Sequence, residues 1–209
     1  DHVFRDLLPA HGMVERPAQV ELSHQMLDTM LNGSIALCDA GTGIGKTYAY
    51  LVAGVVFRRY RSRAGLPNQP LLISTSSIAL QGAIIHDYLP FLSKVMMADG
   101  MLDSPLRAVL RKGKSHYVCD ARLMKRLQTA NLDRKNPLAK AALLSMRDHL
   151  DLDMAPHLSG YDRERICVPP TCDCGKTECR YLCYLDVCAS ERYAIQVCNH
   201  NLLLADAIH

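Results

Sequence analysis

The clearest chemical signature in this sequence is a phosphate-binding pattern at residues 40–47, which read Ala-Gly-Thr-Gly-Ile-Gly-Lys-Thr. Its glycines allow successive backbone N–H groups to turn toward phosphate oxygens, at the positive end of a following helix. Lys46 is expected to reach the β- and γ-phosphates of a nucleotide, and the Thr47 hydroxyl to complete a Mg²⁺ shell. These two are the candidate catalytic residues. The pattern predicts a nucleotide-binding loop, although a flexible loop that ends in Gly-Lys-Thr by chance would look the same.

The elements around this loop predict an α/β fold. An apolar run at 35–38 predicts a buried strand before the loop, and residues from 48 to 59 predict a helix after it. Further apolar runs at 71–75, 107–110 and 193–198 predict strands, with another helix beginning near residue 76. A strand, a helix and a second strand in this order require a parallel crossover. Ligands are then expected at the carboxyl ends of the strands.

A helix that precedes the loop carries two candidate contacts for a base. It begins around Arg16-Pro17, because proline suits the first turn of a helix, and it ends at Asn32-Gly33. Arg16 and Gln19 lie one turn apart on this segment. The side-chain amide of Gln19 could read an adenine edge, but an exposed helix start would show the same residues.

Composition and charge narrow the class of protein. The chain has 209 residues and a net charge of +3, and residues 107–140 carry ten Lys or Arg against two Asp. No apolar run approaches the ~20 residues that a membrane span requires, so no membrane partner is expected. Nine cysteines in a chain with an ATP-binding loop imply a reducing, cytoplasmic environment. In such an environment cysteines more often bind a metal or a cluster than form disulfides.

The composition of the sequence and its predicted elements change after residue 110. Two helices are predicted at about 120–129 and 137–150, followed by a stretch that is rich in cysteine and proline and poor in apolar runs. The predicted division is therefore a first α/β segment at 1–110, an insertion at 111–190 and a return to the α/β domain at 191–209.

Five cysteines fall in one short loop that contains glycine, so the loop cannot build much apolar core. Four thiolates around zinc or an iron–sulfur cluster would hold it, with the distant Cys119 completing a set of four. Free thiols are the alternative. Cys38 and Cys198 lie in predicted strands and are expected in the core, and Cys167 is unassigned. The loop cysteines are Cys172, Cys174, Cys179, Cys183 and Cys188.

Taken in order, five motifs resemble the first motor domain of the DinG/XPD-like superfamily 2 DNA helicases. Ala40, where the general loop pattern has glycine, matches what that family shows. The motifs are Arg-Pro-Ala-Gln at 16–19, the loop at 39–47, Ser-Thr-Ser-Ser-Ile-Ala-Leu-Gln at 74–81, residues 111–119 with the cysteine group, and Val-Cys-Asn-His-Asn-Leu-Leu-Leu-Ala-Asp at 197–206.

The resemblance implies a RecA-like parallel sheet that binds ATP and Mg²⁺, with an inserted, mainly helical iron–sulfur domain. It implies 5′-to-3′ movement on single-stranded DNA, and a nucleoid association if the source is bacterial. The implied [4Fe–4S] ligands are Cys119 and three of the five loop cysteines, assigned here to Cys174, Cys179 and Cys183, which leaves Cys172 and Cys188 as surplus cysteines that could replace one of them; zinc is the alternative metal. The implied ATP-binding residues are Arg16, Gln19, Ala40, Gly41, Thr42, Gly43, Ile44, Gly45, Lys46, Thr47 and Tyr48. The candidate DNA contacts are Ser76, Gln81, Lys112, Lys114, Asn199 and His200.

The sequence departs from the family in one respect. It ends at residues 205–209, where relatives continue into an arch domain and an Asp-Glu-Ala-His motif, so the expectation is a fragment that neither unwinds DNA nor hydrolyses ATP efficiently. Two other hypotheses stay open. One is a zinc-stabilised phosphate-loop enzyme such as a nucleotide kinase, and the other is a DNA-binding module without catalysis.

Overall fold

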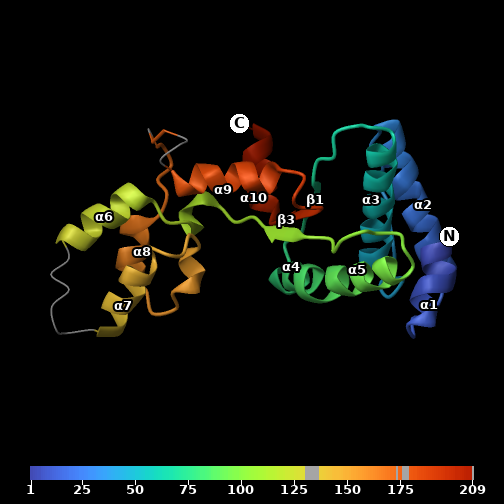
Figure 1. Cartoon of the computed structure of the whole chain (residues 1–209), viewed down its shortest axis with the longest axis horizontal. Helices are drawn as coiled ribbons and strands as arrows, with labels where there is room; N and C mark the ends of the chain where they lie inside the picture. The colour runs from blue at the N-terminus through green and yellow to red at the C-terminus, as the bar shows by residue number, and fades with distance from the viewer. Residues whose placement is uncertain (130–136, 173, 176–178, 209) are drawn as a thin grey trace. The chain divides into compact units, whose positions relative to one another are not determined.

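The computed structural model of the chain describes residues 1–129, 137–172, 174–175 and 179–208 (Figure 1). The chain divides into two compact units: unit 1 comprises Asp1–Arg111 and Ala189–His209, and unit 2 comprises Lys112–Cys188. The elements of unit 1 are the π-helical turn η1 (Val3–Leu7), α1 (Leu8–Ala10), α2 (Pro17–Asn32), α3 (Lys46–Arg63), β1 (Leu71–Ser74), α4 (Ile78–Ala83), the π-helical turn η2 (Ile84–Tyr88), α5 (Leu89–Ala98), β2 (Ala108–Leu110), β3 (Ile195–Cys198) and α10 (His200–Ile208).

The sheet of unit 1 is parallel, which confirms the predicted α/β class. Its strand order is β1-β3-β2, so the strand that comes last in the sequence lies in the middle. Ser74 of β1 lies opposite Cys198 of β3, and Leu110 of β2 lies opposite Val197. All four residues of β3 are buried, as expected for a strand that is covered on both faces.

The predicted strand at 35–38 is wrong. Residues 34–41 contain no strand, and the side chains of Ile35 and Leu37 are fully exposed. Ala36 and Cys38 line a cavity of about 460 Å³ beside β1, together with residues such as Leu71 and Ile73. Only these two small side chains of the segment line that cavity, so the segment buries little apolar area. Among the described residues it pairs with no strand, and a single unpaired strand has no ladder to stabilise it.

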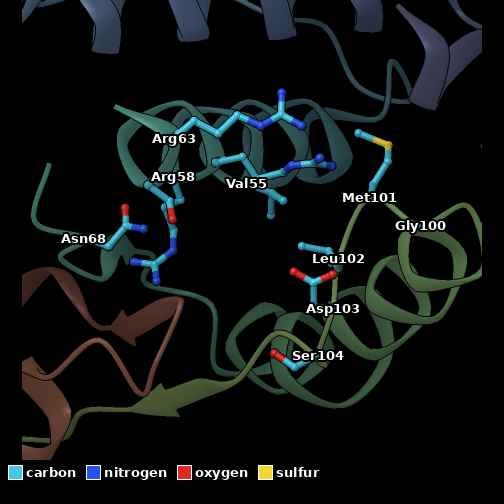
Figure 2. A pocket seen from close by; sticks show the side chains of 11 residues that line it. Val55, Arg58, Arg63, Asn68, Gly100, Met101, Leu102, Asp103 and Ser104 are labelled. Atoms are coloured by element: carbon cyan, nitrogen blue, oxygen red, sulfur yellow. The ribbon is translucent and has the colours of Figure 1, made fainter. Parts of the chain in front are cut away.

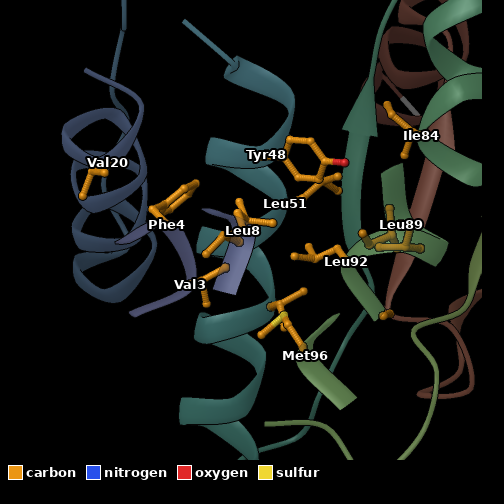
Figure 3. Packing of buried hydrophobic residues seen from close by; sticks show 14 of the residues in the cluster. Val3, Phe4, Leu8, Val20, Tyr48, Leu51, Ile84, Leu89, Leu92 and Met96 are labelled. Atoms are coloured by element: carbon orange, nitrogen blue, oxygen red, sulfur yellow. The ribbon is translucent and has the colours of Figure 1, made fainter. Parts of the chain in front are cut away.

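The core of unit 1 joins the N-terminal turns to α3, α5 and β3 (Figure 3). Phe4 and Leu8 are buried in it, although residues 1–15 show little pattern in the sequence. Leu51 of α3 and Leu92 of α5 are fully buried in the same cluster. This packing fixes α3, and therefore the loop at its N-terminus, against the sheet.

Local signals set the ends of the helices as predicted. Pro17 is the first residue of α2, and Gly33 ends it in the left-handed conformation, with φ +60°. The Ser34 N–H donates to the carbonyl of Thr29 (3.1 Å), which satisfies a carbonyl of the last turn. At the start of α4, the Ser77 hydroxyl accepts from the Leu80 N–H. Of the helices in the described residues, none is long and apolar enough to cross a bilayer.

Unit 2 is mainly helical and has its own core. Leu123, Leu143, Met146 and Ile166 are among its most deeply buried members. The helix predicted at 137–150 ends at Ser145, whose hydroxyl donates to the Ala142 carbonyl and so competes with the helical pattern. The elements are the 3₁₀ turn η3 (Lys114–His116), α6 (Asp120–Thr129), α7 (Pro137–Ser145), the 3₁₀ turn η4 (Leu152–Met154), α8 (Gly160–Ile166) and α9 (Arg180–Ala189).

Candidate functional site

The glycine-rich loop leads directly into α3. Gly43 and Gly45 have φ values of +83° and +86°, which side chains with a Cβ rarely adopt. Gly45 is the N-cap of α3, and Lys46 and Thr47 are the first two residues of the helix. The N-terminus of a helix attracts anions, because its first N–H groups have no partners within the helix. The glycine-rich loop therefore lies at the end of α3 where a bound anion would be favoured.

Lys46 lies over the loop that it follows. Its ammonium donates to the carbonyls of Ala40 and Gly41, each at 2.9 Å, and the side chain is exposed. Thr47 is half-buried. This arrangement keeps the positive charge of Lys46 within the loop, where a nucleotide phosphate could replace the two carbonyl oxygens.

Gln19 supports the glycine-rich loop through a hydrogen bond to its backbone, a role that the sequence did not predict. Its Nε2 donates to the Gly45 carbonyl (2.7 Å), and the residue is only 3% exposed. A Cβ at position 45 would lie 2.0 Å from that same Nε2, so the close approach requires glycine. Arg16, the N-cap of α2, is exposed. The adenine contact predicted for Arg16 and Gln19 stays a prediction. The side-chain amide of Gln19 is already hydrogen-bonded to the Gly45 carbonyl.

Candidate DNA contacts gather at the carboxyl edge of the sheet. The Ser74 hydroxyl and His200 Nδ1 are hydrogen-bonded at 2.8 Å, which links the ends of the neighbouring strands β1 and β3. Asn199 Oδ1 accepts from the Leu202 N–H and so caps α10. The predicted contacts Ser76, Asn199 and His200 are exposed there.

Gln81, also predicted to contact DNA, is turned inward. It is 7% exposed, and its Nε2 donates to the Thr75 carbonyl (2.8 Å). This bond shapes the turn between β1 and α4.

Two basic residues of unit 2 that are predicted to contact DNA, Lys112 and Lys114, bind acceptors within the same unit. Lys112 Nζ lies 2.6 Å from Asp151 Oδ2 and 2.8 Å from Asp153 Oδ2. Lys114 Nζ donates to the Pro170 carbonyl. The pKa of Asp153 falls to about 2, chiefly because it accepts a hydrogen bond from Lys112. The charge of Lys112 is therefore largely balanced within unit 2.

Three of the four cysteines predicted to bind a cluster lie at the starts of two helices, and the fourth, Cys174, lies in the loop that precedes α9. Cys119 immediately precedes α6, and its N–H donates to the Ile166 carbonyl (2.7 Å). Cys179 immediately precedes α9, and Cys183 follows one turn later, so that both lie on one face of the helix. Cys119 and Cys188 are buried, whereas Cys172, Cys174 and Cys183 are exposed.

The thiols of this group influence one another. The pKa of Cys174 rises to about 11, mainly through a hydrogen bond with Cys172, with smaller contributions from Cys119 and Cys179. Soft thiol donors at this density suit zinc or an iron–sulfur cluster. Within the described ranges, however, no three His, Cys, Asp or Glu side chains are arranged to hold a metal ion. The loop also contains residues 173 and 176–178, which lie outside those ranges.

A separate arginine-rich cavity lies at the far end of α3 from the phosphate loop (Figure 2). Its volume is about 490 Å³, and it is lined by Arg58, Arg59 and Arg63 of α3, with Asp103 from the segment that follows α5. Burial lowers the pKa of Arg58. No residue of the predicted nucleotide site lines this cavity, so we treat it as distinct from that site.

The glycine-rich loop and the helix α3 that follows it match the sequence pattern of a phosphate-binding loop, whereas the residues before the loop, at 34–41, form no strand. Comparison with curated proteins narrows the class of protein. The chain is 30% identical over 144 residues to the 3′-5′ exonuclease DinG of Bacillus subtilis, which covers 69% of the chain but 14% of that relative. It is 30% identical over 129 residues to the ATP-dependent DNA helicase YoaA of Haemophilus influenzae, covering 62% of the chain and 18% of that relative.

A third similar protein is the ATP-dependent helicase DinG of Mycobacterium tuberculosis, at 29% identity over 128 residues, or 61% of the chain and 18% of the relative. No protein-family model matches the chain. These similarities confirm the resemblance that the motifs indicated: the chain is related to the DinG-type helicases. It spans less than a fifth of the length of each of these three relatives.

Proposed function

We propose that this chain is the nucleotide-binding part of an ATP-dependent DNA helicase, with unit 1 as part of a RecA-like motor domain. The observation that carries the proposal is the loop at the start of α3, where Lys46 lies over the loop carbonyls and Gln19 supports Gly45. ATP with Mg²⁺ is the proposed ligand. Lys46 would bind the β- and γ-phosphates, and Thr47 would bind the metal ion.

Two of the three relatives described above are named ATP-dependent helicases, whereas the Bacillus subtilis relative is named an exonuclease. The chain spans only 14% of the latter, so that name says little about this segment. We favour the helicase because a phosphate-binding loop has a direct role in an ATP-driven motor. A kinase would need the same loop together with an acceptor site, for which the sequence offers no clear candidate.

Titration of the chain with ATP and Mg²⁺ tests the proposal. Lys46→Ala is expected to weaken ATP binding at least tenfold, because the charge on the terminal phosphates is lost. Lys94→Ala is the matched control, since Lys94 is an exposed lysine of α5 in the same unit. Equal affinity in the wild type and in Lys46→Ala would refute the nucleotide site.

For unit 2 we propose a [4Fe–4S] cluster held by Cys119, Cys174, Cys179 and Cys183, with zinc as the alternative metal. The support is the gathering of thiols around the starts of α6 and α9, close enough to raise the pKa of Cys174. Metal–thiolate bonds would supply ordering energy that this cysteine-rich loop cannot obtain by burial. Metal analysis of anaerobically purified protein separates the possibilities, since a cluster protein contains iron and is brown whereas a zinc protein is colourless.

The proposed nucleic-acid partner is single-stranded DNA. The exposed residues Ser76, Asn199 and His200, at the carboxyl edge of the sheet, are the proposed contacts in unit 1. Binding through phosphates is expected to weaken steeply with salt. If the chain bound DNA but no nucleotide, the hypothesis of a DNA-binding module without catalysis would replace the motor.

A further inference from the structure

A small cavity in unit 2 is surrounded by positive charge. Its volume is about 240 Å³, and it is lined by Arg122, Lys125, Arg126 and Thr129 of α6 and by Arg165, which belongs to α8. No carboxylate occurs among the described residues that line it. Four cations around one cavity repel one another, and an anion inside the cavity would relieve that repulsion.

Two of the four cations are held in place by unit 2 itself. Arg122 donates from Nη1 to the Cys167 carbonyl (2.7 Å) and from Nη2 to the Glu164 carbonyl (3.0 Å). Arg126 Nε donates to Asp162 Oδ1 (2.6 Å), and the Asp162 carboxylate is only 9% exposed. Side chains that are already ordered lose less conformational entropy when a ligand binds.

The ring of Tyr161 contacts two of these cations, Arg126 and Arg165. The guanidinium carbon of Arg165 lies 4.4 Å from the centroid of the Tyr161 ring, and that of Arg126 lies 5.3 Å from it. Such contacts are attractive, because the face of the ring is electron-rich. Asp162 is hydrogen-bonded to the Ser159 hydroxyl as well as to Arg126, so it is satisfied without turning toward the cavity.

The chemistry of the lining points to a phosphate group. Guanidinium groups offer paired N–H donors whose spacing matches two phosphate oxygens, and a lysine adds a point charge. We propose that this cavity binds a backbone phosphate of single-stranded DNA. The inference rests on the proposed function for the identity of the strand. It places contacts on α6 and α8, in addition to the DNA contacts proposed above.

The test compares two double variants of the full chain. Lys125→Gln with Arg165→Gln removes two exposed cations of the cavity and leaves Arg126 to pair with Asp162. Lys140→Gln with Arg147→Gln removes the same charge from exposed positions of unit 2 outside the cavity. The affinity of each for a fluorescent oligothymidylate is measured by anisotropy over a range of salt concentrations.

The cavity variant is expected to bind about tenfold more weakly than the wild type. The slope of log K against log salt is expected to be smaller by about 1.4, from two lost contacts at about 0.7 each on single strands. The control variant is expected to lose less than about twofold. Equal losses in both variants would mean that only overall charge matters, and would overturn the cavity as a site.

The remaining outcomes separate failure of the cavity from failure of the proposed function. Unchanged DNA binding in the cavity variant refutes the inference and leaves the proposed function standing. If the wild type binds no oligothymidylate the inference also fails, and the ATP titration then decides whether the nucleotide site survives. A site for free phosphate is shown if inorganic phosphate raises the melting temperature of the wild type but not of the cavity variant, while both bind DNA equally. That result overturns the assignment to DNA.

Discussion

Arg180 forms a two-pronged ion pair with Asp120, and each of these residues directly follows a cysteine that we propose as a cluster ligand. Arg180 Nε lies 2.9 Å and 3.0 Å from the two carboxylate oxygens of Asp120. The same guanidinium donates to the Met146 and Arg147 carbonyls just after α7. One side chain therefore ties the starts of α6 and α9 to the end of α7, next to Cys119 and Cys179.

We expect Arg180→Gln to loosen the cysteine group. The ion pair is partly exposed, so its own contribution to stability is small. Its position matters more, because it fixes the spacing of two proposed ligands. The variant is expected to lose iron to a chelator several-fold faster than the wild type, and to be cleaved more readily by protease within residues 165–190.

Lys140→Gln removes one exposed cation from the same unit and is the control for this change. Identical iron release and cleavage in Arg180→Gln and the wild type would show that the pair does not position the cysteines.

A second prediction concerns Gln19. If its main role is to support the Gly45 carbonyl, Gln19→Ala should weaken ATP and inorganic triphosphate alike, by about fivefold for the loss of one hydrogen bond of about 1 kcal/mol. If Gln19 contacts adenine instead, the variant should bind ATP more weakly but bind inorganic triphosphate as well as the wild type does. Titration calorimetry with the two ligands distinguishes these cases, and Arg16→Ala serves as the comparison at the exposed start of α2.

Gly45→Ala probes the same contact from the other side. The new Cβ would meet Gln19 Nε2 and would also strain a residue at φ +86°. We expect a loss of nucleotide affinity and a lower melting temperature. Gly82→Ala is the control, because a Cβ there meets nothing within 4 Å. Equal behaviour of the two variants would argue against a close packing of the loop on α2.

A third prediction concerns acid stability. Lys112, then Arg163, hold the pKa of Asp153 near 2, below its ordinary value of 3.8. A carboxylate whose pKa is depressed in the folded state contributes stability that is present above the unfolded pKa and is lost as the pH falls through the folded pKa. Asp153→Asn should therefore be less stable than the wild type at about pH 5–7, and the difference should shrink between about pH 4 and 2.

Urea unfolding of both proteins across this pH range measures the difference. The carboxylate is 43% exposed, so a modest effect is expected. A difference in the free energy of unfolding that did not change between about pH 5 and 2 would contradict the ion-pair explanation.

A fourth prediction concerns Cys119, which is 7% exposed and packs with Tyr117 and Val168. Cys119→Ser should give colourless protein, cleavage within residues 165–190 and weaker binding of single-stranded DNA, while ATP binding survives. Cys38→Ser and Cys198→Ser in unit 1 should keep the colour. If the wild type contained neither iron nor zinc and its 165–190 segment still resisted protease, the metal proposal would be wrong.

Local signals in the sequence were sufficient for much of the fold. Pro17 and Gly33 mark the ends of α2 because their effects on the backbone depend on no distant residue. The strands at 71–74, 108–110 and 195–198 were predictable from apolar runs. The glycine-rich loop could be recognised from the sequence because its glycines lie within a few residues of Lys46 along the chain.

The wrong strand at 35–38, and the contacts that the sequence did not predict, involve partners that lie far away in the sequence, whereas the early end of the helix predicted at 137–150 is local. The run at 35–38 has the composition of a strand, but a strand also needs a neighbour with a free edge, which composition does not reveal. The contact between Gln19 and Gly45 and the pairing of Lys112 with Asp151 likewise depend on tertiary structure. In the sequence, Arg122 and Arg126 belong to the basic region at 107–140 and Arg165 lies outside it, and only the fold brings all three around one cavity.

The central position of β3 has a consequence for the order of events during synthesis. Leu71 and Leu110 leave the ribosome well before Ile195 and Val197, their partners in the sheet, because all of unit 2 is made in between. Unit 2 is one continuous segment, so it can complete its core while the strands of unit 1 still lack their middle member. Closing such long-range pairs is slow compared with forming local helices. The nascent chain therefore carries two apolar strands without their central partner until β3 emerges, which is the interval in which a holdase chaperone would matter most.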